Sequence, residues 1–260
     1  MALLSLPGDH CSITEGFPCL LMFLGESMKF KSSLFLLVMA TAGMSHVTHS
    51  YAAGMVPETS LLIINEAEEG GSINVKNTDP KAALLYTNIV DLADDHGTHL
   101  VVTQPVVRVE SGQTQHLRFI LKTDAPLKEE HLKRVTFEGI PQKMPGKNKV
   151  GFNIRQDIPV LIHPANLPIV KDAWTLLKWS ATGSQVKVNN PSPYVVRLAP
   201  QFQLLPSHTA GELSKSYILP GETLTATVTT GVTGNNQLKF TPASRYGIQV
   251  ESYTAPLAAQ

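Results

Sequence analysis

Short apolar runs and alternating stretches, separated by turn residues, make up most of the chain from residue 61 onward. A period of two residues is typical of a strand with one buried face, because successive side chains of a strand point to opposite faces. Clusters such as Gly70-Gly71 and Asp94-Asp95-His96-Gly97 favour turns. The pattern predicts no long helix and the following strands: 61–64, 72–76, 83–90, 99–103, 115–121, 133–140, 174–180, 185–189, 194–199, 216–219, 223–229, 238–241 and 247–253.

The most regular alternation lies in residues 149–155, where Val150, Phe152 and Ile154 share one face. Ile158, Val160 and Ile162 continue the same alternation and lie on the same face. Alternation alone is also what an ordinary half-buried core strand would show, so that interpretation remains open at this point.

Residues 163–168 contain two prolines and are typical of a stiff linker. About seven short strands on each side of it, spaced by turns, are the signature of β-sandwiches of about 100 residues each. The pattern therefore predicts an all-β protein of two immunoglobulin-like β-sandwich domains, residues 53–165 and 166–260.

A secretory signal is predicted over residues 28–52. Lys29 and Lys31 precede the apolar run 34–40, and small residues follow up to Ala52. This order of regions is typical of a cleaved signal, and the run is too short to span a bilayer comfortably. We predict cleavage after Ala52.

Residues 1–27 resemble neither part of a signal nor a domain. A signal normally has only a few residues before its basic region, so we predict that translation starts at Met28. A genuine upstream extension is the alternative. Cys11 and Cys19, the only cysteines, lie in this segment, so the mature protein would be stabilised by apolar cores without disulfides.

The charge balance of the chain gives no support for nucleic acid as a partner. Lys and Arg number 21, Asp and Glu also number 21, and the formal net charge is zero. There is therefore no electrostatic reason to expect nucleic acid as a partner. The hydrophobic fraction of 43% is that of a globular protein.

The sequence carries no phosphate-binding glycine loop, nucleophile elbow or zinc-helix motif. We therefore predict no enzymatic activity, no cofactor and no metal. His96 and His99, beside Asp94 and Asp95, leave a metal site open as an alternative. An Asp-His-Gly sequence is, however, more typical of a turn.

Several segments, in their order and spacing, resemble the periplasmic pilus-assembly chaperone family of the chaperone–usher pathway. Asn190-Pro191-Ser192-Pro193-Tyr194 resembles the family's Asn-Pro-Thr-Pro-Tyr element. The resemblance implies two immunoglobulin-like domains in an L or boomerang arrangement, and a periplasmic location. The other segments that carry it are 75–79, 103–109, 112–113, 117–120, 139–141, 162–164, 219–221 and 245–247.

The resemblance implies that the protein binds pilin subunits and passes them to an outer-membrane usher without a nucleotide. A pilin lacks its last strand, and the chaperone lends one of its own. Val150, Phe152 and Ile154 fall where the family places its donor residues. Burial of three such side chains contributes roughly 1.5–3 kcal/mol each. An exposed apolar edge would also favour a self-capping homodimer.

The sequence departs from the family where the pilin's C-terminal carboxylate is held. The family uses an arginine on its first strand and a lysine near the end of the donor strand, and these positions fall on Ser60 and Pro159. Neither can pair with a carboxylate as a cation can. Arg155, four residues before Pro159, is a candidate substitute anchor, although an exposed strand arginine is often simply solvated.

The family also has an ion triad where its two domains meet. By position it would involve Glu130, His163 and Arg245, with an arginine in place of the usual acid. We predict that Glu130 and Arg245 pair, with His163 beside them; three independent surface residues are the alternative. The short loop 142–148 resembles that of short-loop chaperones.

Two further functions remain open from the sequence. An exported immunoglobulin-like pilin or adhesin would typically carry a cysteine pair and an N-terminal donor extension, whereas residues 53–260 contain no cysteine and their most regular alternating strand lies in the middle of the chain. A free carbohydrate-binding module would need exposed aromatic residues. Trp174 and Trp179 begin the second predicted domain, where packing explains them more simply.

Overall fold

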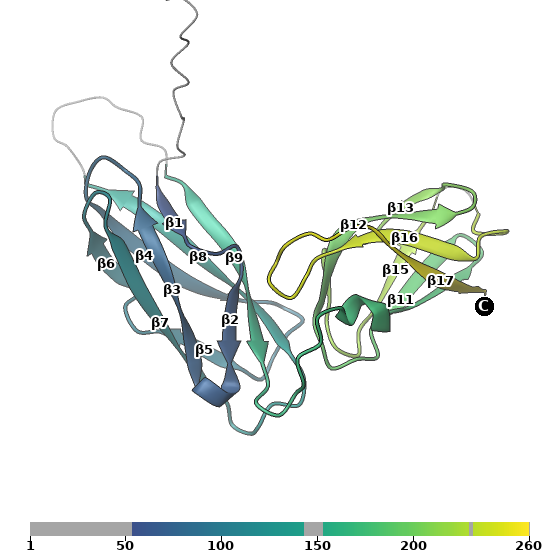
Figure 1. Cartoon of the computed structure of the whole chain (residues 1–260), viewed down its shortest axis with the longest axis horizontal. Coiled ribbons are helices and arrows are strands. Elements are labelled where there is room, and N and C mark those ends of the chain that lie inside the picture. Colours follow the sequence, from purple (N-terminus) through teal and green to yellow (C-terminus); the bar gives the residue numbers. More distant parts are fainter. Residues whose placement is uncertain (1–53, 143–152, 229–230, 260) are drawn as a thin grey trace, which may run out of the picture. The chain divides into compact units, whose positions relative to one another are not determined.

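The computed structural model describes residues 54–142, 153–228 and 231–259, and these form two β-sandwiches (Figure 1). The predicted signal, its cleavage site and the upstream extension lie outside the described residues, as do Val150 and Phe152. In the part of the chain that is described, no helix is both long and apolar enough to cross a membrane.

The N-terminal sandwich follows the hydrogen-bonded strand order β5-β7-β3-β2-β9-β8-β4-β6, with β1 paired to β3. All of its pairings are antiparallel except that of β2 with β9. A short 3-10 helix, η1 (Glu66–Glu68), joins β2 to β3. The strands are β1 (Met55–Pro57), β2 (Leu62–Asn65), β3 (Gly70–Asn77), β4 (Ala83–Asp91), β5 (His99–Val102), β6 (Val106–Val109), β7 (Thr114–Lys122), β8 (His131–Pro141) and β9 (Arg155–His163).

The alternation in the sequence explains the core of this sandwich. On β9, Ile158, Val160 and Ile162 are buried and pack in one cluster with Phe119 and Phe137 of other strands. Because side chains alternate along a strand, these residues of β9 share one face, and burial of each contributes about 1.5–3 kcal/mol. On the opposite face of β9, Leu161 and His163 are buried as well, in contacts outside this core.

The C-terminal sandwich has the strand order β13-β12-β16-β17-β10-β11-β15, with β14 paired to β12. Trp179 is buried in its core, with ring centroids 5.9 Å from Phe202 and 5.2 Å from Phe240. Packing thus explains this tryptophan. A 3-10 helix, η2 (Ala173–Leu176), precedes the strands β10 (Lys178–Thr182), β11 (Gln185–Asn189), β12 (Val196–Leu205), β13 (Ala210–Glu212), β14 (Tyr217–Ile218), β15 (Thr223–Thr227), β16 (Gln237–Pro242) and β17 (Tyr253–Ala259).

The predicted fold class, all-β with two sandwiches, is confirmed. The strand predicted over 247–253 is wrong. Gly247 donates a backbone hydrogen bond to Ser244, and its φ of +81° fits a turn rather than a strand. The segment predicted to begin a strand at Trp174 is η2. The L or boomerang arrangement and the domain boundary after Ala165 stay predictions.

Asn190 explains why the Asn-Pro-Ser-Pro-Tyr element needs its first residue. Its side chain is fully buried, and Nδ2 lies 2.7 Å from the Tyr194 carbonyl and 3.1 Å from the carbonyls of Ile218 and Leu219. Its Oδ1 accepts a hydrogen bond of 2.6 Å from the Ser192 hydroxyl. One buried amide thus donates to the carbonyls of three residues and accepts from a hydroxyl, which ties three parts of the chain together.

We expect Asn190→Ala to lower the free energy of unfolding by about 2–4 kcal/mol, because it removes the buried hydrogen bonds to the carbonyls of Tyr194, Ile218 and Leu219. Urea denaturation followed by tryptophan fluorescence measures this loss. Asn189→Ala is the matched control, since the neighbouring amide bonds Thr223 at an exposed position. Equal urea midpoints for the two variants would contradict the assigned role of Asn190.

Candidate functional site

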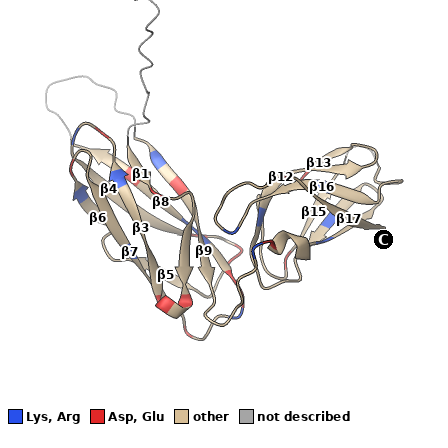
Figure 2. Cartoon of the chain, viewed as in Figure 1, with Lys and Arg blue, Asp and Glu red and all other residues tan. Residues whose placement is uncertain are grey.

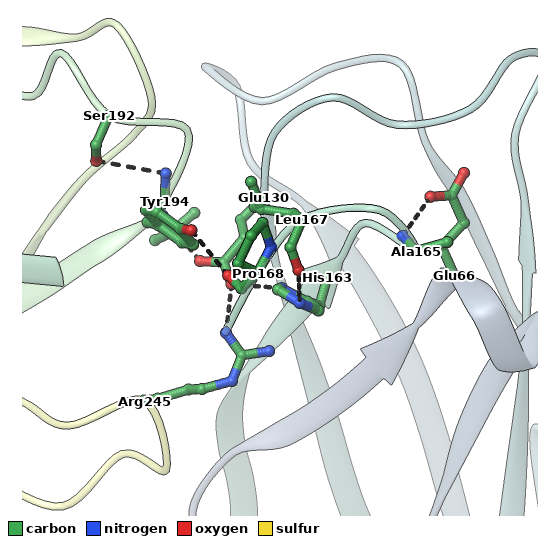
Figure 3. A network of polar contacts seen from close by, with 10 residues as sticks. Glu66, Glu130, His163, Ala165, Leu167, Pro168, Ser192, Tyr194 and Arg245 are labelled. Atoms are coloured by element: carbon green, nitrogen blue, oxygen red, sulfur yellow. Dashed lines mark hydrogen bonds and ion pairs between the residues drawn. The ribbon is translucent and has the colours of Figure 1, made fainter. Parts of the chain in front are cut away.

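Glu130 lies at the centre of a buried polar network (Figure 3). Its Oε1 is 2.9 Å from His163 Nδ1 and 2.5 Å from Arg245 Nη1. Its Oε2 accepts a hydrogen bond of 3.0 Å from the backbone N–H of Val195. The structure thus brings together the three residues predicted to form an interdomain bridge.

The three side chains reach this point from different elements. Glu130 immediately precedes β8, His163 ends β9, and Arg245 lies in the segment between β16 and β17. Their exposed fractions are 2%, 8% and 7%. Because removing a carboxylate from water is costly, Glu130 depends on the positive charge and the N–H groups around it.

A separate apolar cluster contains residues from both sandwiches. It is distinct from the two sandwich cores, and Ile63 of β2 is one of the partly buried residues that pack against it. The cluster removes further apolar surface from water, which stabilises the folded chain. Its buried members are Leu61, Leu132, Leu161, Val195 and Leu219.

The loop after β4 makes a second polar connection. Asp94 contacts Lys215, which also lies 2.6 Å from Glu222 Oε1, and Tyr217 donates its hydroxyl to Asp94. Burial by itself would raise the pKa of Asp94, but the hydrogen bond and charge of Lys215 bring that pKa below its ordinary value. The sequence contained no periodic signal for this contact, because it joins side chains 121 residues apart.

One edge of β9 is open near its start. The strand pairs with β8 from Arg155 to Ile162, but with β2 only from Val160 to His163. Among the described residues, no strand pairs with the other edge of 155–159. An open edge offers unpaired N–H and C=O groups to another chain. Ile154, which comes immediately before β9, is 42% exposed.

Two protein-family models match the chain. The model described as "Pili and flagellar-assembly chaperone, PapD N-terminal domain" matches residues 54–168, and "Pili assembly chaperone PapD, C-terminal domain" matches residues 172–254. The chain belongs to the pilus-assembly chaperone family. The matched ranges cover both sandwiches, so the resemblance noted in the sequence is confirmed.

Individual relatives agree with this membership. The chaperone is 49% identical over 210 residues to the uncharacterized fimbrial chaperone YhcA of Escherichia coli K12, covering 80% of this chain and 93% of that protein. It is 24% identical over 210 residues to the probable fimbrial chaperone LpfB of Escherichia coli O157:H7, covering 78% and 88%.

Solved structures share the fold at lower identity. The Salmonella enterica SafA pilin–SafB chaperone complex matches with a TM-score of 0.64 and 18% identity, covering 80% of this chain and 98% of the matched chain. The CupB2 chaperone of Pseudomonas aeruginosa matches with a TM-score of 0.63 and 22% identity, covering 78% and 100%.

The two positions where the family holds a carboxylate differ in their surroundings. Ser60 is exposed, while Pro159 is buried and lies opposite Arg134 in the β8–β9 register. Arg155 is 62% exposed, and its Nη2 lies 2.8 Å from Glu138 Oε2. This guanidinium therefore already has an anionic partner, and its role as a substitute anchor stays a prediction.

Charged and metal-ligating residues are dispersed over the molecule. No group of three or more His, Cys, Asp or Glu side chains suited to hold a metal occurs in the described part of the chain. Figure 2 shows acidic and basic residues interspersed over both sandwiches. Nothing in the local sequence marks Arg134 and Arg197, because each follows an ordinary strand alternation; in the fold, burial and then the charge of Arg134 lower the pKa of the Arg197 guanidinium.

Proposed function

We propose that this chaperone acts in the periplasm, binds pilin subunits by lending them a strand and transfers them to an outer-membrane usher. It would do so without catalysis and without a cofactor. Membership of the family supports the chaperone role. The open edge of β9 at residues 155–159 is the single structural observation that carries the strand-lending proposal.

The donor segment would be Val150 to Ile154, directly before that edge. An incoming pilin would pair its main chain with the edge, and the alternate apolar side chains Val150, Phe152 and Ile154 would fill its groove. Main-chain hydrogen bonds tolerate many sequences, whereas the side-chain pockets select the partner. Transfer would then require only exchange of one strand for another.

Three further features belong to the proposed function: export, the contact between the two domains, and the state of the chaperone without a client. Residues 28–52 would direct export and be removed after Ala52. The Glu130–His163–Arg245 network would hold domain 53–165 against domain 166–260. Without a client, a homodimer would cover the open edge, because exposed strand edges tend to pair with other chains.

Co-purification tests the proposal directly. The mature chain, tagged at its C-terminus, is expressed in a periplasm together with the pilins encoded beside its gene. We expect recovery of a complex with one pilin per chaperone. Recovery of the chaperone without any pilin would reject the proposed function and favour a free binding module.

A further inference from the structure

We propose that His163 acts as a doubly protonated imidazolium that clamps the linker 163–168 through the carbonyl of Leu167, and that a rise in pH releases this clamp. From the sequence, His163 was predicted only to lie beside Glu130 and Arg245. The clamp gives the histidine a separate role, which is to bind the backbone of the linker. It is a property of the free chaperone and does not depend on the proposed lending of a strand.

Both ring nitrogens of His163 face oxygen atoms that can only accept a hydrogen bond (Figure 3). Nδ1 lies 2.9 Å from Glu130 Oε1, and Nε2 lies 3.0 Å from the carbonyl oxygen of Leu167. A neutral imidazole has one N–H group and one lone pair, so it can donate to only one of these oxygens. In either neutral tautomer the other nitrogen directs its lone pair at an oxygen. The imidazolium donates to both.

Neither acceptor supplies the missing proton. Glu130 Oε1 also accepts a hydrogen bond of 2.5 Å from Arg245 Nη1, and Oε2 accepts one of 3.0 Å from the backbone N–H of Val195. A protonated carboxyl group would disturb one of these bonds, because its O–H donates instead of accepting. The carbonyl of Leu167 has no hydrogen to donate. Both protons therefore belong to the ring of His163.

The fold holds the ring between its two acceptors. His163 ends β9, and the register of β8 with β9, continued by one residue, places Glu130 opposite it. On the other side, β2 pairs with His163 at Asn65. The side chain is only 8% exposed, so little water reaches a ring nitrogen that loses its partner. An unsatisfied nitrogen at this place costs free energy, which favours the protonated ring.

His131 provides a contrast within the same sandwich. Its Nδ1 lies 2.5 Å from Asp95 Oδ1, and in the described part of the chain its Nε2 has no hydrogen-bond partner. A neutral ring with its hydrogen on Nδ1 satisfies that single acceptor. The contacts thus require a second proton on His163 but not on His131.

The other side chains that hold the linker do not respond to pH near neutrality. Glu66 Oε2 accepts a hydrogen bond of 2.8 Å from the backbone N–H of Ala165, which needs no proton on the carboxylate. The hydroxyl of Tyr194 donates to the carbonyl of Pro168 at 2.8 Å, and burial raises the pKa of this hydroxyl, so it keeps its hydrogen. Histidine is the side chain whose charge ordinarily changes between about pH 5 and 8. The contact made by His163 is therefore the one that pH controls.

The direction of the effect follows from the charges around the ring. In the described part of the chain these are the anion of Glu130, before β8, and the cation of Arg245, between β16 and β17. When the pH rises, the ring keeps the hydrogen on Nδ1, because that hydrogen faces the carboxylate. It loses the one on Nε2, which faces a neutral carbonyl. The bond to Leu167 is thus present at lower pH and lost at higher pH, while the bond to Glu130 remains.

Nitrogen NMR of the mature chain counts the protons on the ring directly. We expect both ring nitrogens of His163 to carry a hydrogen at pH 7, where a histidine of an unfolded chain is mostly neutral. At pH 9 we expect only Nδ1 to carry one. His163→Gln identifies the signals by removing them. A ring with one bare nitrogen at pH 7 would overturn the proposal.

Hydrogen exchange at the Leu167 amide measures the clamp itself. This N–H donates to the carbonyl of Pro164 within the linker, next to the carbonyl that His163 holds. We expect its protection factor, which is corrected for the pH dependence of free exchange, to fall about 10- to 100-fold from pH 6 to pH 9, the effect of losing a hydrogen bond to a charged group. The Ala165 amide, which Glu66 binds, should change less.

Three variants separate the clamp from a general effect of pH. His163→Arg keeps a charged donor at both pH values and should abolish the pH dependence. His163→Gln has no charge to lose and should show low protection of the Leu167 amide at both. His99→Gln is the matched control, because it removes an exposed histidine of β5 and should behave as the unmodified chain. Circular dichroism checks that each variant is folded, and the NMR of the unmodified chain decides the matter if one is not.

Two results would reject the clamp. One is equal protection of the Leu167 amide at pH 6 and pH 9 in the unmodified chain. The other is a pH effect that persists in both His163→Arg and His163→Gln, or that disappears in His99→Gln. None of these measurements uses a pilin, so a failure to recover pilin would reject the proposed function and leave the clamp standing.

Discussion

Changing Phe152 and Ile154 together to aspartate should abolish recovery of a pilin complex while the chaperone stays folded. Each side chain contributes roughly 1.5–3 kcal/mol when it is buried in a partner's groove. The two losses alone lower affinity by at least about 100-fold, and the burial of new carboxylates opposes binding further. Co-purification from a periplasm and circular dichroism of the free variant measure the two parts of this prediction.

The matched control is Val101→Asp. Val101 is an exposed apolar residue of β5, away from the open edge of β9. It should leave pilin recovery unchanged, because its side chain contributes nothing to the proposed donor segment. A pilin complex that survives the Phe152 and Ile154 changes would keep the chaperone in its family but move the donor strand elsewhere.

Glu130→Ala should lower the free energy of unfolding by about 3–5 kcal/mol, because it leaves the buried Arg245 guanidinium without a carboxylate. The same change removes the acceptors for His163 Nδ1 and for the backbone N–H of Val195. Urea denaturation of the purified mature chain measures the loss. The effect should be large because Glu130 is nearly inaccessible to water.

Two variants separate this role from a general effect of charge. Glu138→Ala removes the carboxylate of the exposed ion pair with Arg155 and should cost no more than about 1 kcal/mol. Glu130→Ala combined with Arg245→Met should recover part of the stability, since the unpaired Arg245 charge is then gone. A Glu130→Ala variant as stable as Glu138→Ala would show that the network does not stabilise the protein.

Local patterns in the sequence predicted the strands well where one face is buried. The alternation of residues 72–76, 115–121 and 185–189 corresponds to β3, β7 and β11, because burial on one face imposes a period of two. The prediction failed at 247–253, where the apolar residues look strand-like. There Gly247, with a φ of +81°, donates a backbone hydrogen bond to Ser244 and closes a turn instead of continuing a strand.

The candidate site, too, could be predicted from the sequence only in part. The family's motifs located Glu130, His163 and Arg245 by position, and the structure places their side chains within hydrogen-bonding distance. Their action as an interdomain bridge remains a proposal. At the two positions where the family carries its basic anchors, the sequence shows only the uncharged residues Ser60 and Pro159. Arg155 was the one substitute anchor that the sequence suggested.

The all-β class, the two sandwiches and the family follow from the amino-acid sequence without coordinates, because they depend on periodic burial and on motifs along the chain. The open edge of β9 and the two acceptors around the ring of His163 emerge only when the chain is folded. Pairing between strands and proximity between side chains depend on segments far apart in the sequence. No local pattern records that the ring of His163 meets the carbonyl of Leu167 at one nitrogen and Glu130, 33 positions away, at the other.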